Sequence, residues 1–222
     1  MTLSFGQYYP RIGPRGWPYQ ETVYYKHILS AQRQLELLCR ELDGIFTFVE
    51  PVDEHRHVYS HRLRNLLIVA ATEFEAQCVG ILEANGVGPN GHYFNTTDYI
   101  RLLPVFQLDQ YRIGLSMFPS YPSLGPFEGW SASNPTTSLP WYDAYNKTKH
   151  NRESNFGLAT IENALQAVGA CFCMYMAQVF VGNQLMCGVG EIFSVIAIPR
   201  GDATGTFRIR CGDTPTAVNY PF

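Results

Sequence analysis

The sequence has 222 residues, of which 46% are hydrophobic and 16% are charged, and its formal net charge is −3. This length suits one well-packed domain, and the composition is that of a globular chain and not of a disordered one. A negative net charge argues against a surface that covers long duplex nucleic acid, which needs an extended cationic field, but it allows a local basic patch. No apolar run has the length of a signal peptide or of an uninterrupted spanning helix, so we expect a cytoplasmic protein with no membrane partner.

The first part of the chain predicts an arm followed by two helices. Residues 1–20 are rich in proline and aromatic residues, which excludes a helix and predicts an extended arm lying across the body or a partner subunit. In residues 21–43, apolar residues recur at steps of four and three, which predicts a helix that stops at Gly44. A second apolar face predicts a helix over residues 55–84, ended by Asn85 and Gly86.

Residues 86–140 are rich in proline and glycine and predict an irregular insertion over one end of the helical body. Two segments within it have ordered patterns. Residues 98–103 predict one or two helical turns, and residues 111–118 alternate enough to predict a strand.

Residues 141–182 predict a polar helix and then a central helix, which we expect over residues 156–182 because one side is large and apolar and the other mostly small. The tail from residue 183 to 222 changes period. Residues 191–199 and 206–211 predict two strands joined by a Gly/Asp turn, a small β-hairpin that could pair with the strand of the insertion. The whole chain therefore predicts one mainly helical α+β domain.

The polar segment PWYDAYNKTKHNR precedes the central helix and carries the best candidate site. On a helix, Tyr145, Lys149 and Arg152 share one stripe, and Asn146 and His150 form the stripe beside it. Fixed cations next to an imidazole can hold a phosphodiester and move a proton, because histidine titrates near neutrality. The alternative is a solvated helix whose tryptophan and tyrosine rings pack on the core.

A second candidate pair lies on the second predicted helix. Arg62 and Glu73 are eleven positions apart, about three turns, so they lie on nearly the same side. They bracket an apolar run and would either point into a polar pocket or form a surface pair.

The block LPWYDAYNKTKHNRESNFGLATIENALQAVGACF resembles a signature of HEPN-like helical domains, found in uncharacterised bacterial proteins and phage-defence components. Such domains often have a tryptophan-rich lead-in, the pattern Tyr-Asn-x-x-Lys-His-x-Arg and a helix with a leucine-bearing face. The segment HRLRNLLIVAATEFEAQCVGIL resembles their earlier helix. The resemblance implies an up-and-down bundle of four or five helices that forms homodimers. It also implies RNA binding, and in many members a metal-independent endoribonuclease of a defence or toxin-like system.

The family's site residues transfer only in part. Asn146 matches its polar position and His150 its histidine, which acts on the ribose 2′-hydroxyl, while the position of its arginine holds Tyr145. Lys149 and Arg152 are the neighbouring cations that would supply the missing charge. The resemblance thus assigns His150, Asn146, Lys149 and Arg152 as catalytic candidates, with Tyr145, Arg62 and Glu73 as substrate-binding candidates.

A non-catalytic function remains as the alternative. HEPN-like domains also serve as dimeric modules that bind a ligand or a protein partner, and Asn146, His150 and Arg152 would then make structural hydrogen bonds.

The segment DEHRHVYSH raises a further alternative, a zinc site made by His57 and His61 with an acidic residue such as Asp53 or Glu54. No third ligand has a recognisable spacing, so we expect a polar helix start, no metal and no cofactor. The six cysteines include no Cys-x-x-Cys pair and predict reduced, buried thiols.

Overall fold

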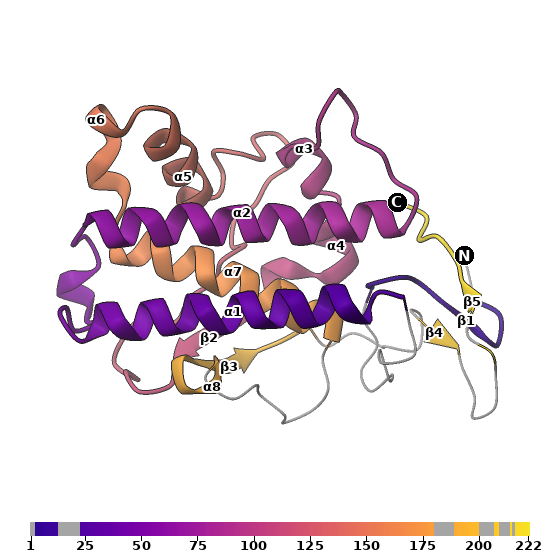
Figure 1. The fold of residues 1–222 in the computed structure, drawn as a ribbon, viewed down its shortest axis with the longest axis horizontal. Helices are drawn as coiled ribbons and strands as arrows, with labels where there is room; N and C mark the ends of the chain where they lie inside the picture. Colours follow the sequence, from indigo (N-terminus) through magenta and orange to yellow (C-terminus); the bar gives the residue numbers. More distant parts are fainter. Residues whose placement is uncertain (1–2, 13–22, 180–188, 200–206, 209–213, 215) are drawn as a thin grey trace.

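The computed structural model describes residues 3–12, 23–179, 189–199, 207–208, 214 and 216–222, and most of these lie in helices (Figure 1). The longer helices are α1 (Tyr25–Phe46), α2 (His61–Ala84), α5 (Pro140–His150) and α7 (Ile161–Val179). The shorter ones are α3 (Thr96–Tyr99), α4 (Leu102–Phe106), α6 (Arg152–Asn155) and α8 (Val189–Ile192), with 3-10 turns at Asp53–His55, Leu108–Gln110 and Phe156–Leu158. The prediction of a mainly helical protein is confirmed.

Helix α1 buries the predicted apolar stripe but continues past the predicted stop. Gly44 lies inside the helix, which ends at Phe46. Ile45 and Phe46, which follow Gly44, are buried and continue the apolar face of the helix. Their packing therefore outweighs the helix-breaking tendency of glycine.

Helix α2 begins later than the sequence pattern predicts, because Ser60 caps it by accepting a hydrogen bond from the backbone N–H of Leu63 at 3.2 Å. It ends at Ala84 as predicted, and Gly86 follows with a φ of +73°. Among the described residues, α2 alone is long and apolar enough to span a membrane. However, 50% of its apolar window is buried inside the protein, so its composition is a weak indication of a membrane helix.

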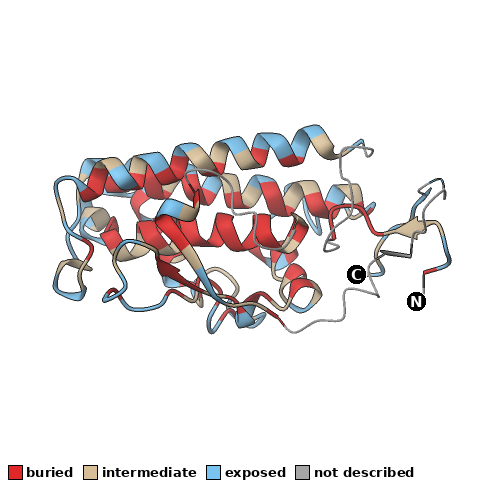
Figure 2. Ribbon diagram, turned by 90° about the horizontal axis from the view of Figure 1, so that it is seen from below, coloured by how far each residue is buried: buried red, intermediate tan, exposed pale blue. Residues whose placement is uncertain are grey.

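Helices α2 and α7 run side by side in the same direction at the centre of the body (Figure 1). The Cys171 thiol donates to the carbonyl of Ala70 at 3.1 Å, and further along both helices Gln178 donates to Gln77 at 3.2 Å. Helix α7 is central, as predicted, and is buried on nearly every side. It begins at Ile161 and not at residue 156, because Phe156–Leu158 forms a separate 3-10 turn. Figure 2 shows the wider pattern, in which buried residues line the facing sides of the long helices and exposed residues line the outer sides.

Helices α1 and α5 lie on either side of this central pair and run in the opposite direction. Contacts between α2 and α5 pair Arg64 with Thr148 and Glu75 with Tyr142, so the chain numbers rise along one helix and fall along the other. Successive long helices therefore alternate in direction from α1 to α7.

The insertion packs firmly onto the central helices. Phe74 of α2 lies at the centre of an aromatic cluster with Tyr99, Phe127, Trp130 and Trp141, whose ring centroids are 5.3–6.2 Å from its own. On α7, Gly169 permits the closest approach, since a Cβ there would lie 2.7 Å from Cδ1 of Ile113 and 3.2 Å from Cγ of Pro126.

The strands form two small sheets, and the predicted C-terminal hairpin is wrong. Strand β2 (Arg112–Leu115) pairs antiparallel with β3 (Phe193–Ala197). Strand β1 (Gln7–Tyr8) of the arm pairs antiparallel with β4 (Phe207–Arg208) and parallel with β5 (Thr216–Ala217). The two predicted tail strands exist in part but do not pair with each other. The expected pairing of a tail strand with the strand of the insertion is confirmed for β3, whereas β4 pairs with the arm.

The described cysteines behave as small core residues. Cys39, Cys78, Cys171 and Cys173 are unpaired and buried. Burial raises the pKa of the Cys39 thiol to about 12, which keeps it protonated. Cys187 and Cys211 lie outside the described residues.

Candidate functional site

The polar segment folds as two helices that are separated at Asn151, where the backbone leaves the helical conformation (φ −141°, ψ 79°). Helix α5 starts with Pro140 in its first turn and ends at His150. Asn151 then caps α6 by accepting a hydrogen bond from the backbone N–H of Ser154 at 3.2 Å. The predicted single helix is therefore interrupted immediately before Arg152.

Tyr145 is fully buried, at 0% exposure. Its hydroxyl lies 3.5 Å from Oε2 of Glu75, and Nζ of Lys149 donates to the same hydroxyl at 2.8 Å. Nζ also lies 4.9 Å from the centre of the tyrosine ring. The hydrogen bond to Tyr145 raises the pKa of Lys149, so this amine is held as a cation at one place on the surface.

Glu75 joins α2 to α5 through a second tyrosine. Tyr142 donates its hydroxyl to Oε1 of Glu75, and burial together with this bond raises the pKa of Tyr142 far above its usual range. Arg64, on the same side of α2, donates to the carbonyl oxygen of Thr148 at 3.1 and 3.2 Å. This places a guanidinium at the C-terminal end of α5, where the helix dipole favours a cation.

The remaining catalytic candidates are at the surface. Lys149, His150 and Arg152 are exposed, and Asn146 is half-buried. Within the described chain, the side chains of Asn146, His150 and Arg152 form no hydrogen bond or ion pair. We call Lys149, His150 and Arg152 the α5–α6 corner, because they occupy the last turn of α5 and the first residue of α6.

The structure does not bring Arg62 and Glu73 to this corner. Arg62 contacts α1, where it donates to Glu41 at 2.8 Å and to the carbonyl of Gly44 at 3.2 Å. Arg64 and Glu75 have the same spacing of eleven residues but lie two positions further along, about 200° around the helix, and they face α5. Sequence spacing alone did not identify which of the two pairs faces the candidate site.

Glu73 instead begins a buried chain of polar side chains that links α2, α7 and the arm. It accepts from Gln77 at 3.0 Å, Gln77 accepts from Gln178 at 3.2 Å, and Gln178 accepts from Arg11 at 2.9 Å. Burial raises the pKa of Glu73, and the hydrogen bond from Gln77 and the charge of Arg11 oppose this shift.

A hollow of about 590 Å³ lies at the start of α7, near the α5–α6 corner along the chain. We call it the α7 hollow. It is lined by polar, aromatic and small residues, namely His57, Tyr59, Gly125, Pro126, Glu128, Pro140, Trp141, Gly157, Leu158, Thr160, Glu162, Asn163 and Gln166.

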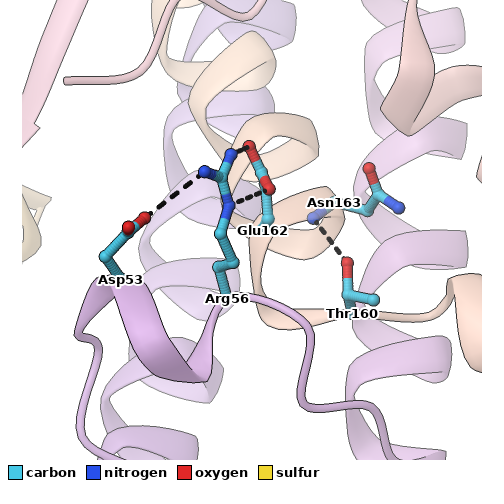
Figure 3. Close-up of polar contacts among 5 residues, drawn as sticks. All are labelled: Asp53, Arg56, Thr160, Glu162 and Asn163. Atoms are coloured by element: carbon cyan, nitrogen blue, oxygen red, sulfur yellow. Dashed lines mark hydrogen bonds and ion pairs between the residues drawn. The ribbon is translucent and has the colours of Figure 1, made fainter. Parts of the chain in front are cut away.

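Ion pairing and capping fix one wall of the α7 hollow (Figure 3). The Arg56 guanidinium donates two hydrogen bonds to the carboxylate of Glu162, one of them at 2.7 Å from Nε to Oε2, and it also lies 3.3 Å from Asp53. Thr160 caps α7 by accepting from the backbone N–H of Asn163 at 3.2 Å. Arg56 and Glu162 were not among the sequence candidates, because 106 positions separate them and neither forms part of a motif.

The histidines that suggested a zinc site are dispersed around the start of α2. His61 packs its ring on Phe156, with centroids 4.5 Å apart, and Nδ1 of His55 lies 2.8 Å from the carbonyl oxygen of Glu50. His57 lines the α7 hollow. Across the described residues, no group of three or more His, Cys, Asp and Glu side chains is arranged to hold a metal ion.

Comparison of the chain with protein-family models, with curated proteins and with solved structures finds no match.

Proposed function

We propose that this protein is a HEPN-like RNA-binding protein that contacts RNA phosphates through the α5–α6 corner. The observation that carries the proposal is the placement of Lys149, His150 and Arg152, exposed together on a chain whose net charge is −3. Lys149 and Arg152 are permanent cations suited to phosphate oxygens. The alternating directions of the long helices are compatible with the bundle that the resemblance implies.

The buried Tyr145 accounts for the missing arginine of the family pattern. Its hydroxyl holds Nζ of Lys149 at 2.8 Å, so the cation comes from one turn further along α5. A cation that is already fixed loses less conformational freedom when it binds a phosphate than a mobile lysine does.

We further propose that His150 promotes metal-independent cleavage of the bound strand. The imidazole takes the proton of a ribose 2′-hydroxyl, and the oxygen attacks the adjacent phosphorus while the bond to the 5′-oxygen breaks. The proton is then returned to the leaving 5′-oxygen, which gives a 2′,3′-cyclic phosphate and a free 5′-hydroxyl. Lys149 and Arg152 stabilise the charge on the phosphoryl oxygens, and Asn146 supplies an amide that orients the strand.

The test measures binding and cleavage of a mixed single-stranded RNA pool in EDTA. We expect the Lys149→Gln/Arg152→Gln double variant to weaken binding by about 100-fold or more, since each charge-assisted hydrogen bond contributes about 1.5–3 kcal/mol. His150→Ala should bind almost normally but cleave about 100-fold more slowly or worse. Lys147→Gln is the matched control, because Lys147 is exposed on the same helix and pairs with Asp143 at 2.6 Å.

The two parts of the proposal fail separately. Equal binding by the double variant and the Lys147→Gln control would rule out the corner as the RNA site. Undiminished cleavage by His150→Ala would rule out the mechanism while leaving RNA binding intact. Light scattering on the same samples checks the proposed homodimer, for which the mass should be twice that of one chain.

The non-catalytic alternative has less support from this site. It assigns structural hydrogen bonds to Asn146, His150 and Arg152, and within the described part of a single chain their side chains form none. A second chain would have to supply those partners.

A further inference from the structure

We propose that the α7 hollow binds one unstacked base of the RNA strand held at the α5–α6 corner, with preference for bases that carry an amino group. This deepens the proposed function and rests on it, because it specifies single-stranded RNA as the ligand and assigns a second contact to the strand. Single-stranded RNA is read by proteins through unstacked bases that stack on aromatic rings and form hydrogen bonds at their edges.

Tyr59 provides the stacking surface. Its side chain is 53% exposed although it is aromatic, and it lines the α7 hollow. The ring is held from behind by Phe156, with centroids 5.4 Å apart and an interplanar angle of 86°. The ring is therefore positioned and still largely exposed, and such a ring binds bases in single strands with little dependence on their identity.

The hydrogen-bonding groups of the α7 hollow favour ligands that donate. Gln166 lines the hollow, and its Oε1 is buried with no hydrogen-bond partner among the described residues. Glu128 and Glu162 add carboxylates, each of them ion-paired with an arginine. A buried oxygen without a donor is costly, and a ligand that supplies an N–H removes that cost. Adenine, cytosine and guanine carry an exocyclic amino group with two N–H donors. The single N3–H of uracil instead lies between two carbonyl oxygens, which would face the carboxylates of the hollow.

The volume and position also fit a base next to a bound phosphate. A volume of about 590 Å³ falls within the range of small-molecule sites. Gly157, which lines the hollow, follows Arg152 by five residues, which limits their separation to about 18 Å at full extension. A strand of a few nucleotides can therefore reach from the corner to the hollow.

The experiment compares the affinity of the protein for short oligo(A), oligo(C) and oligo(U), with adenosine and uridine 5′-monophosphate as separate titrants in calorimetry. The wild-type protein should bind oligo(A) and oligo(C) several-fold more tightly than oligo(U). Tyr59→Ala should weaken binding to all three by about tenfold or more, as the loss of a base stack does. Tyr93→Ala is the matched control, because Tyr93 is 85% exposed and lies in the insertion.

The Gln166→Met variant distinguishes a loss of base recognition from a loss of stability. It removes the unpartnered oxygen while keeping the side-chain volume, so we expect an equal or higher melting temperature and a loss of the preference for amino-bearing bases.

Equal affinity for the three oligonucleotides, or a Tyr59→Ala protein that binds like Tyr93→Ala, would overturn the base site even if the corner variants weaken binding. If the protein binds no RNA, the proposed function fails, and the titrations with the two nucleotides then test the base site alone. The base site is supported if the wild-type protein binds adenosine monophosphate and the Gln166→Met protein does not. It is rejected if the wild-type protein binds neither nucleotide.

Discussion

At the residue scale, Glu73 is a carboxylate that becomes partly buried, and so partly desolvated, when the chain folds. It lies on α2, half-buried, at one end of the polar chain that leads through Gln77 and Gln178 to Arg11. Burial is the largest influence on its pKa and raises it above the value expected in the unfolded chain. The ionised form is therefore less favourable in the folded protein than in the unfolded one.

Glu73→Gln should accordingly stabilise the protein at neutral pH. A raised folded-state pKa contributes stability below the unfolded pKa of about 4.3 and loses it as the pH rises through the folded value, so the ionised wild type is penalised at pH 7. Urea unfolding at pH 7 and at pH 4 would measure the gain in free energy of unfolding, which should shrink at pH 4. Glu83→Gln, exposed on the same helix, should show no gain; a Glu73→Gln protein less stable than wild type at pH 7 would contradict this.

The same residue shows what the sequence could and could not predict about the site. Residue types and periodicity placed Asn146, Lys149 and His150 on one short helix, and the structure has them there. Whether Glu73 or Glu75 faces α5 depends on how α2 is rotated about its axis relative to α5. A spacing of eleven residues from an arginine does not determine that rotation. The role of Tyr145 was also out of reach, because its two polar partners include Glu75, 70 positions away.

At the scale of elements, Asn85 ties both terminal segments to the end of α2. Its buried amide donates to the carbonyl of Pro10 at 2.8 Å and accepts from the backbone N–H of Tyr220 at 2.9 Å. The rings of Tyr9 and Tyr220 meet beside it, with centroids 5.0 Å apart. One side chain thus satisfies backbone groups of two segments that are distant in the sequence.

Asn85→Ala should therefore weaken the attachment of both terminal segments to the end of α2. Leaving buried backbone groups without partners costs about 1–3 kcal/mol, which thermal unfolding would detect. Limited proteolysis should cut near both termini faster than in the wild type. Asn65→Ala is the control, since Asn65 is exposed on the same helix and its loss should change stability by less than about 0.5 kcal/mol. Faster cleavage at only one terminus would show that the segments are held independently.

Elements with a long apolar stripe were predictable, and strand partners were predictable only in part. The stripes of α1 and α2 follow from local spacing, whereas their exact ends depend on Ser60 and on the buried residues after Gly44. The hairpin failed for the same reason at longer range. Alternation predicted the β2–β3 pair, but the pairing of β4 with β1 of the arm, about 200 positions earlier, has no local signal.

At the scale of the whole molecule, the charge balance limits how RNA can be held. The formal net charge is −3, with 16 lysines and arginines against 19 acidic residues. Several described cations are already paired, as Arg33, Arg56 and Arg62 are with carboxylates. The proposed contact is therefore local and involves few phosphates.

A local contact should show a shallow dependence on salt. Two phosphates neutralised by Lys149 and Arg152 predict a slope of log K against log salt of about −1.4 for a single strand, or a loss of about sevenfold between 50 and 200 mM. The Lys149→Gln/Arg152→Gln protein should have a slope near zero, and Lys147→Gln should keep that of the wild type. Fluorescence anisotropy with a labelled oligonucleotide across this range measures all three. A wild-type slope of about −4 or steeper would instead require a wide cationic surface, which a chain with this charge balance does not favour.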